Sequence, residues 1–206
     1  MIHRTPIFAA AVLLVSAAAS GLQAQNSTAE VFGGWSFAHA NPESTLSSTS
    51  MNGWVGSAAG YANRWFGVGF EIAGQFGSIA PPSSAAGAPN LSSKEYSYLA
   101  GPQFRFLNKK QVQSSFRLLV GGVFGQVNLA ASTTAAQVNA LGAAGYGGFN
   151  ETKFAALFAV PVDFSVTRLI GIRVEPGIYL TNFNQSGQGN FRVSIGPVFR
   201  FGGKAD

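Results

Sequence analysis

The chain has 206 residues, of which only 10% are charged and none is cysteine. Ordinary soluble proteins carry about 25% charged residues, so a soluble surface is hard to build from this composition. The absence of cysteine excludes disulfides and thiolate metal sites. The formal net charge of +5 is spread along the chain without a dense basic patch, which argues against nucleic-acid binding.

The first segment has the features of a secretory signal peptide. Arg4 supplies a positive start, an apolar stretch follows over residues 6–19, and Leu22-Gln23-Ala24 offers a small residue for cleavage. The apolar stretch is shorter than the roughly 20 residues that a membrane-spanning helix needs. We therefore expect a signal peptide over residues 1–24 and a single domain over residues 25–206.

The rest of the chain is predicted to form strands, because apolar and polar residues alternate with a period of two. The eight predicted strands cover residues 29–38, 51–61, 66–78, 96–106, 115–129, 153–165, 170–182 and 190–202.

The predicted connections alternate in length. Short turns are expected around residues 63–64, 108–110 and 167–168. Longer polar or small-residue loops are expected over residues 39–50, 79–95, 130–152 and 183–189. Eight antiparallel strands with short turns at one end and long loops at the other indicate an all-β fold, a closed eight-stranded antiparallel transmembrane β-barrel.

Two pairs of segments nearly repeat each other. The sequence Gly-Pro-Gln-Phe-Arg-Phe at 101–106 is matched by Gly-Pro-Val-Phe-Arg-Phe at 196–201. The turn and strand at 63–71 are matched at 167–175, where an Arg is followed by Gly and then by an inward Glu. The pattern indicates either a duplicated four-strand unit or the same positional constraints met twice.

On these motifs the chain resembles the OmpA-like family of small eight-stranded outer-membrane β-barrels. The most specific features are the Arg-x-x-Gly motifs at 64–67 and 168–171 and the aromatic final strand. The resemblance implies that the barrel-assembly machinery reads the final strand, through Val193, Ile195, Phe199 and Phe201. It covers the barrel only, and no periplasmic domain is expected after it.

The alternation assigns charge to the barrel interior. One face of the strands is apolar, and a charge placed there at mid-bilayer depth would cost ~2–4 kcal/mol. The charged residues are therefore expected to face inward, where they would form a structural network of ion pairs. This predicted lumenal network consists of Glu71, Arg105, Arg117, Asp163, Arg173, Glu175, Arg192 and Arg200.

Two further expectations concern the interior and the strands. Leu99, Leu119, Leu157 and Tyr179 also face inward by this register and are expected to form an apolar plug beside the charges. Four prolines fall inside predicted strands, where each removes a ladder donor, so local bulges are expected at these positions. They are Pro102, Pro161, Pro176 and Pro197.

Alternatives to a closed structural barrel remain open at this stage. A soluble lipocalin-like barrel would share the alternation and the Gly33-Gly34-Trp35 tripeptide, but the lumenal charges argue against it. A narrow pore for ions or small solutes would need a hydrated lumen. An outer-membrane lipid-modifying enzyme would use His39, the one histidine left after the signal peptide, although no nucleophile and carboxylate stand at a recognisable spacing from it.

The expected role is therefore structural or surface-interacting, in the outer membrane of a bacterium of the Gram-negative type. The long loops would contact an extracellular partner. The other expected partners are outer-membrane lipids and the barrel-assembly machinery, and nucleic acid is not expected. We expect no catalytic residue, no metal and no cofactor.

Overall fold

The computed structural model describes residues 29–40, 49–79, 90–109, 111–128, 133–143, 150–182 and 188–202. The predicted signal peptide lies outside these residues. The elements, in chain order, are β1 (Ala29–Ala40), β2 (Thr49–Tyr61), β3 (Phe66–Ile79), β4 (Leu91–Asn108), β5 (Val112–Asn128), α2 (Ala135–Ala143), β6 (Asn150–Ala159), β7 (Val162–Ser165), β8 (Ile170–Thr181) and β9 (Gln188–Phe201).

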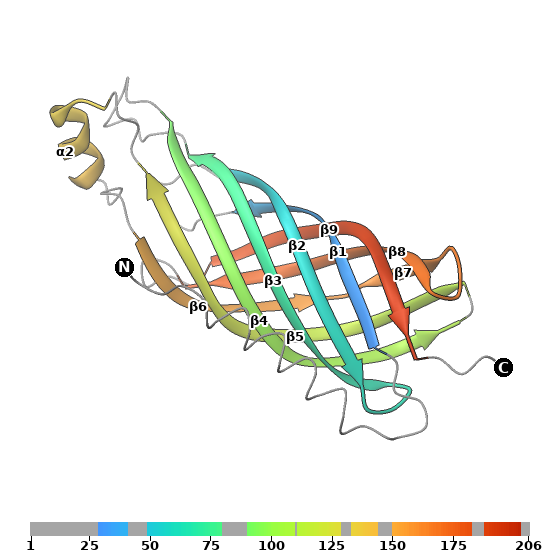
Figure 1. The fold of residues 1–206 in the computed structure, drawn as a ribbon. Coiled ribbons are helices and arrows are strands. Elements are labelled where there is room, and N and C mark those ends of the chain that lie inside the picture. The colour runs from blue at the N-terminus through green and yellow to red at the C-terminus, as the bar shows by residue number, and fades with distance from the viewer. Residues whose placement is uncertain are drawn as a thin grey trace, which may run out of the picture.

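The strands form one antiparallel sheet that closes on itself (Figure 1). Apart from β6 and β7, which share one position, each strand pairs with its neighbour in the sequence, and β9 pairs with β1 to complete the ring, for example through Phe199 and Val31. Closure leaves no exposed sheet edge, so every strand has a partner on both sides. The predicted closed antiparallel barrel is confirmed.

The sixth predicted strand is divided into β6 and β7, which together occupy one of the eight positions in the ring. Both pieces pair with β5 on one side and with β8 on the other. The break falls at Val160 and Pro161, because proline has no N–H to continue the ladder. The carbonyl of Pro161 still accepts hydrogen bonds from Ser115 N at 3.1 Å and from Ser114 Oγ at 3.0 Å.

The predicted bulges at Pro102, Pro161, Pro176 and Pro197 were wrong. Pairing is in one continuous register on either side of each proline, so these residues interrupt the ladder without adding a residue to it. The irregularity recorded between β4 and β5 lies instead between Arg105 and Leu107.

Two turns that repeat in the sequence also repeat in their hydrogen bonds. Asn63 Oδ1 accepts from the backbone N–H of Trp65 and of Phe66, at 3.0 and 2.8 Å. Thr167 Oγ1 accepts from the equivalent groups of Leu169 and Ile170, at 3.2 and 3.0 Å. A short polar side chain before the Arg therefore closes each turn, as expected for Asx and Ser/Thr turns.

The two ends of the barrel differ. The end that carries these turns and the link between β4 and β5 is called the turn end below, and the opposite end is called the loop end. Helix α2 lies at the loop end, between β5 and β6 (Figure 1), in a segment that was predicted as loop throughout. Strand β4 begins at Leu91, earlier than predicted. Among the described residues, no helix has the length and apolar character to cross a membrane.

Candidate functional site: the charged interior of the barrel

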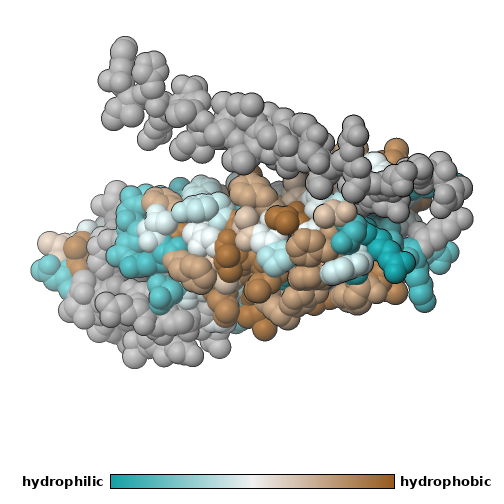
Figure 2. Space-filling view, turned by 90° about the horizontal axis from the view of Figure 1, so that it is seen from below, coloured by the Kyte–Doolittle hydropathy of each residue, from teal (hydrophilic) through white to brown (hydrophobic). Residues whose placement is uncertain are grey.

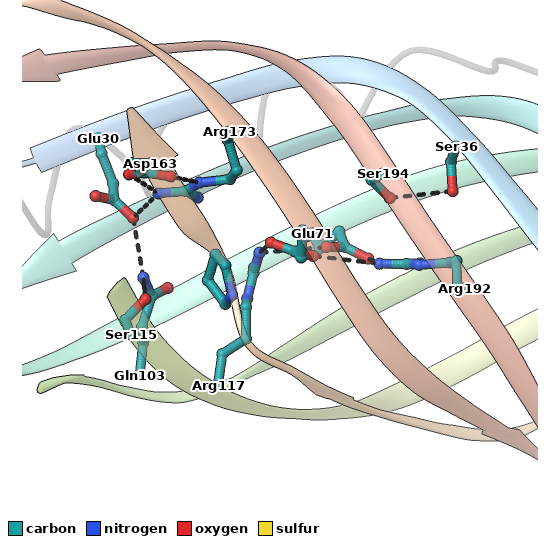
Figure 3. Close-up of polar contacts among 12 residues, drawn as sticks. Glu30, Ser36, Glu71, Gln103, Ser115, Arg117, Asp163, Arg173, Arg192 and Ser194 are labelled. Atoms are coloured by element: carbon teal, nitrogen blue, oxygen red, sulfur yellow. Dashed lines mark hydrogen bonds and ion pairs between the residues drawn. The ribbon is translucent and has the colours of Figure 1, made fainter. Parts of the chain in front are cut away.

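The structure places all eight residues of the predicted lumenal network inside the barrel. Successive side chains of a strand point to opposite faces, so these side chains point inward while their aromatic and aliphatic neighbours point outward. Seven of the eight are buried, each with at most 9% of its surface exposed, and the side chain of the eighth, Arg105, is 7% exposed. Figure 3 shows two groups along the barrel axis, one with Asp163 and Arg173 and the other with Glu71, Arg117 and Arg192.

The first group lies toward the turn end and is centred on Arg173. Its guanidinium donates to Asp163 through Nε at 2.7 Å and through Nη2 at 2.9 Å. The same Nη2 donates to Glu30 at 2.8 Å. Arg200 Nη2 contacts Asp163 at 3.0 Å, and Arg105 Nη2 contacts Glu30 at 3.5 Å. Each carboxylate is therefore shared between two arginines.

The second group contains two arginines and two glutamates. Arg117 Nη1 lies 2.7 Å from Glu175 and 3.4 Å from Glu71. Arg192 Nη2 lies 2.6 Å from Glu71 and 3.6 Å from Glu175. Each arginine thus has one short and one long ion pair, and the glutamates come from the equivalent positions of the two repeated segments.

Gln103 is linked to the first group. Its Nε2 donates to Glu30 at 2.9 Å and to Ser115 Oγ at 3.0 Å, and it also contacts the hydroxyl of Tyr61. Because Nε2 faces the carboxylate, Oε1 faces away, and it has no hydrogen-bond partner among the described residues. Nε and Nη2 of Arg117 likewise have no partner within the described ranges. Burial of polar atoms without partners costs free energy. The ion pairs of the two groups compensate for this cost.

Glu30 was missed at the sequence level, although it is 3% exposed and belongs to the first group. A signal for it was present in strand β1. Trp35 points outward with 48% of its surface exposed, so even-numbered residues of this strand face inward. With Glu30 included, the two groups described here contain five arginines and four carboxylates.

The inward leucines form a separate apolar layer. Leu99, Leu119, Leu157 and Tyr179 are buried together with Val123, Ala155 and Ala159. This is the position expected for an apolar plug beside the charges. Arg192 lies over the Tyr179 ring at 5.7 Å, so the layer adjoins the second group of charges.

The outer face of the barrel carries an apolar belt. On the face seen in Figure 2, hydrophobic residues form a band across the middle, with hydrophilic residues toward both ends. Residues such as Phe70, Tyr98, Val120, Phe158 and Ile178 are exposed on this face. In water such a belt would be unfavourable, whereas the hydrocarbon core of a bilayer would cover it.

The remaining predicted residues have these positions. In β9, Ile195, Phe199 and Phe201 are exposed on the belt, and Val193 is half-buried. His39 is exposed on the outer face near the loop end, and its Nδ1 lies 3.2 Å from Ser50 Oγ. Within the described part of the chain, no group of three or more His, Cys, Asp or Glu side chains could hold a metal ion.

Comparison with solved structures identifies the architecture. Ail, the attachment invasion locus protein of Yersinia pestis, matches with a TM-score of 0.56 at 13% identity, over 86% of this chain and 100% of that one. The fold is that of the small outer-membrane β-barrels. Neisserial surface protein A matches with a TM-score of 0.60 at 13% identity, covering 85% of this chain and 97% of the other. OprG, an outer-membrane protein of Pseudomonas aeruginosa, matches at 0.52 and 10%, covering 86% and 97%.

These likenesses confirm at the level of the fold the resemblance inferred from the sequence. No model of a known protein family matches the chain. No curated protein matches it by sequence.

Proposed function

We propose that the chain is a bacterial outer-membrane β-barrel whose role is structural or surface-interacting, with the long loops as its contact surface. The observation that carries this proposal is the combination of an apolar belt outside with ion pairs inside a closed ring of strands. A soluble lipocalin-like barrel would need the opposite arrangement, with a polar exterior.

The interior favours a plug over a pore. Arginines and carboxylates in contact fill one part of the lumen, and leucines fill the adjoining part. An eight-stranded barrel encloses only enough space for its own side chains. A structural role for the lumenal network therefore has more support than a path for ions, which needs a continuous column of water.

The composition of the loops indicates the chemistry of an extracellular partner. The segments 41–48, 80–89, 129–149 and 183–187 together contain a single charged residue, Glu43. Ail has been crystallised with the heparin analogue sucrose octasulfate. A polyanion needs clustered basic groups, which these loops lack, so the partner proposed here is neutral and recognised through hydrogen bonds, as a carbohydrate would be.

Catalysis is not part of this proposal. His39 and Ser50 are in contact, yet an acyl-transfer site also needs a group that orients the histidine and donors that stabilise an oxyanion. The final strand is proposed to be the segment that the assembly machinery reads, through its outward residues Ile195, Phe199 and Phe201 together with Val193.

Cell fractionation and gel mobility test the location. The protein should sediment with outer membranes and migrate differently on SDS gels before and after boiling, because a closed hydrogen-bond ladder resists detergent. Recovery as a soluble periplasmic protein would contradict the proposal and favour the lipocalin-like alternative.

A glycan array tests the partner. Purified barrel should bind neutral glycans and leave sulfated heparin fragments unbound, and a variant with residues 135–143 deleted should lose binding while it keeps its heat-dependent gel shift. Preferential binding of the sulfated fragments would contradict the partner chemistry without affecting the location.

A further inference from the structure

The exposed charges of the barrel are distributed unequally between its two ends. Each turn at the turn end carries an exposed cation: Arg64 between β2 and β3, Lys109 between β4 and β5, and Arg168 between β7 and β8. None of the three makes an ion pair with another described residue. We call these three residues the basic rim.

No exposed carboxylate opposes the basic rim within the described ranges. The two acidic residues near this end, Glu30 and Asp163, are buried in the lumen and paired with arginines. Two further described carboxylates, the half-buried Glu95 and the exposed Glu151, belong to the loop-end halves of their strands, and Glu151 pairs with Lys153 at 2.8 Å. The turn end therefore has a net positive surface, while the loop end is close to balanced.

The basic rim also lies at the boundary of the apolar belt. Arg64 is followed by Trp65, which is 52% exposed, and Arg168 by Leu169, which is 62% exposed. Phe106, 66% exposed, precedes the turn of Lys109. A cation at such a boundary keeps its charged group in the headgroup layer while its apolar stem and neighbours lie in hydrocarbon.

The two arginines are held in the same way. Asn63 and Thr167 close their turns with equivalent hydrogen bonds, so each Arg has the same place in a turn of the same construction. The turns belong to β2–β3 and β7–β8, which are separated in the ring by β1 and β9. The cations are thus distributed around the barrel.

We propose that the basic rim binds the phosphate groups of anionic phospholipids. This inference rests on the proposed membrane location and extends it by naming the class of lipid that binds at the turn end. A basic residue near an anionic membrane surface contributes about 1 kcal/mol, and a guanidinium can hold a phosphate through two parallel N–H donors. With the long loops on the extracellular side, the turn end lies at the inner leaflet of the outer membrane, so the ligand is a phospholipid of that leaflet.

Spin-labelled lipids test the selection directly. The barrel is reconstituted in phosphatidylcholine vesicles, and electron paramagnetic resonance measures the association of labelled phosphatidylglycerol relative to labelled phosphatidylcholine. The parent should prefer phosphatidylglycerol by about fivefold, the ratio that corresponds to about 1 kcal/mol. In 1 M salt the ratio should fall toward unity, because the Debye length is then only about 3 Å.

Two sets of variants place the effect. The triple variant Arg64→Gln, Lys109→Gln, Arg168→Gln should lose the preference, whereas the control Lys94→Gln, Lys153→Gln at the loop end should keep it. No preference in the parent, or an equal loss in the control, would overturn the proposal. A heat-dependent gel shift, measured on the same vesicles, distinguishes failure of the lipid proposal from failure of the membrane location. A chain that is not folded in the vesicles contradicts the membrane location itself.

Discussion

Glu30 and Arg173 lie 143 residues apart in the sequence, and inside the barrel Arg173 Nη2 donates to Glu30 Oε1 at 2.8 Å. The contact joins β1 to β8 across the lumen, although the two strands are not neighbours in the ring. Because Glu30 also accepts from Tyr61 and Gln103 and contacts Arg105, its carboxylate connects three strands besides its own, β2, β4 and β8.

The first prediction follows from this contact. Glu30→Gln should leave Arg173 and Arg105 with less compensation in a buried site, which can cost about 3–5 kcal/mol when one partner of a buried pair is removed. The urea midpoint of the detergent-solubilised barrel measures the loss. Glu151→Gln is the matched control, since its pair with Lys153 is exposed and should contribute less than about 1 kcal/mol. Equal midpoints for the two variants would contradict a stabilising role for Glu30.

The second prediction concerns the depth of the apolar belt. Val120 lies near the middle of β5, and Val120→Lys should cost ~2–4 kcal/mol, as expected for a charge at the bilayer midplane. Phe104→Lys, nearer the turn end, should cost less because its ammonium reaches the headgroups. Both lysine variants should fold less well into vesicles than Val120→Leu and Phe104→Leu. Equal folding of the lysine and leucine variants would show that the inward and outward faces have been assigned the wrong way round.

The third prediction tests the equivalence of the two repeated turns. Asn63→Ala and Thr167→Ala each remove an acceptor for two backbone N–H groups, and each should cost about 0.5–2 kcal/mol. Thr167→Ser keeps the hydroxyl and should behave like the parent. The double alanine variant should show additive losses in urea unfolding, since the turns share no contact. A loss of stability in only one of the two single variants would contradict the prediction. It would show that the two turns share their geometry but not their contribution to stability.

The fourth prediction separates plug from pore. Because the side chains of the second group and the leucine layer fill the lumen, the purified barrel should show no steady conductance in planar bilayers. Glu71→Ala should lower the urea midpoint, since Arg192 loses its 2.6 Å partner. A stable open current in the parent, with Glu71→Ala changing ion selectivity and leaving stability unchanged, would support the pore.

The sequence alone was sufficient to assign side chains to the two faces of the barrel. Period-two alternation is local, so Arg192, Ser194 and Arg200 could be placed on one face of the final strand and Phe199 on the other without knowing the neighbouring strands. The scarcity of charge then decided which face is inside, because a charge is expensive in hydrocarbon and acceptable in a paired interior. Fold class and the membership of the predicted lumenal network depend only on these local facts.

Tertiary structure decided which of these charges meet. The contacts of Arg117 with Glu71 and Glu175, and of Glu30 with Arg173, cross the lumen between strands that are distant in the sequence. Such distances depend on the tilt and stagger of the closed sheet, which no local pattern specifies. Closure of the ring also keeps the strands that contain Pro102 and Pro176 in register. Each strand is paired on both sides, so the alignment persists where a single ladder hydrogen bond is missing. The alternation of side chains is a property of each strand, whereas the pairing of charges is a property of the ring.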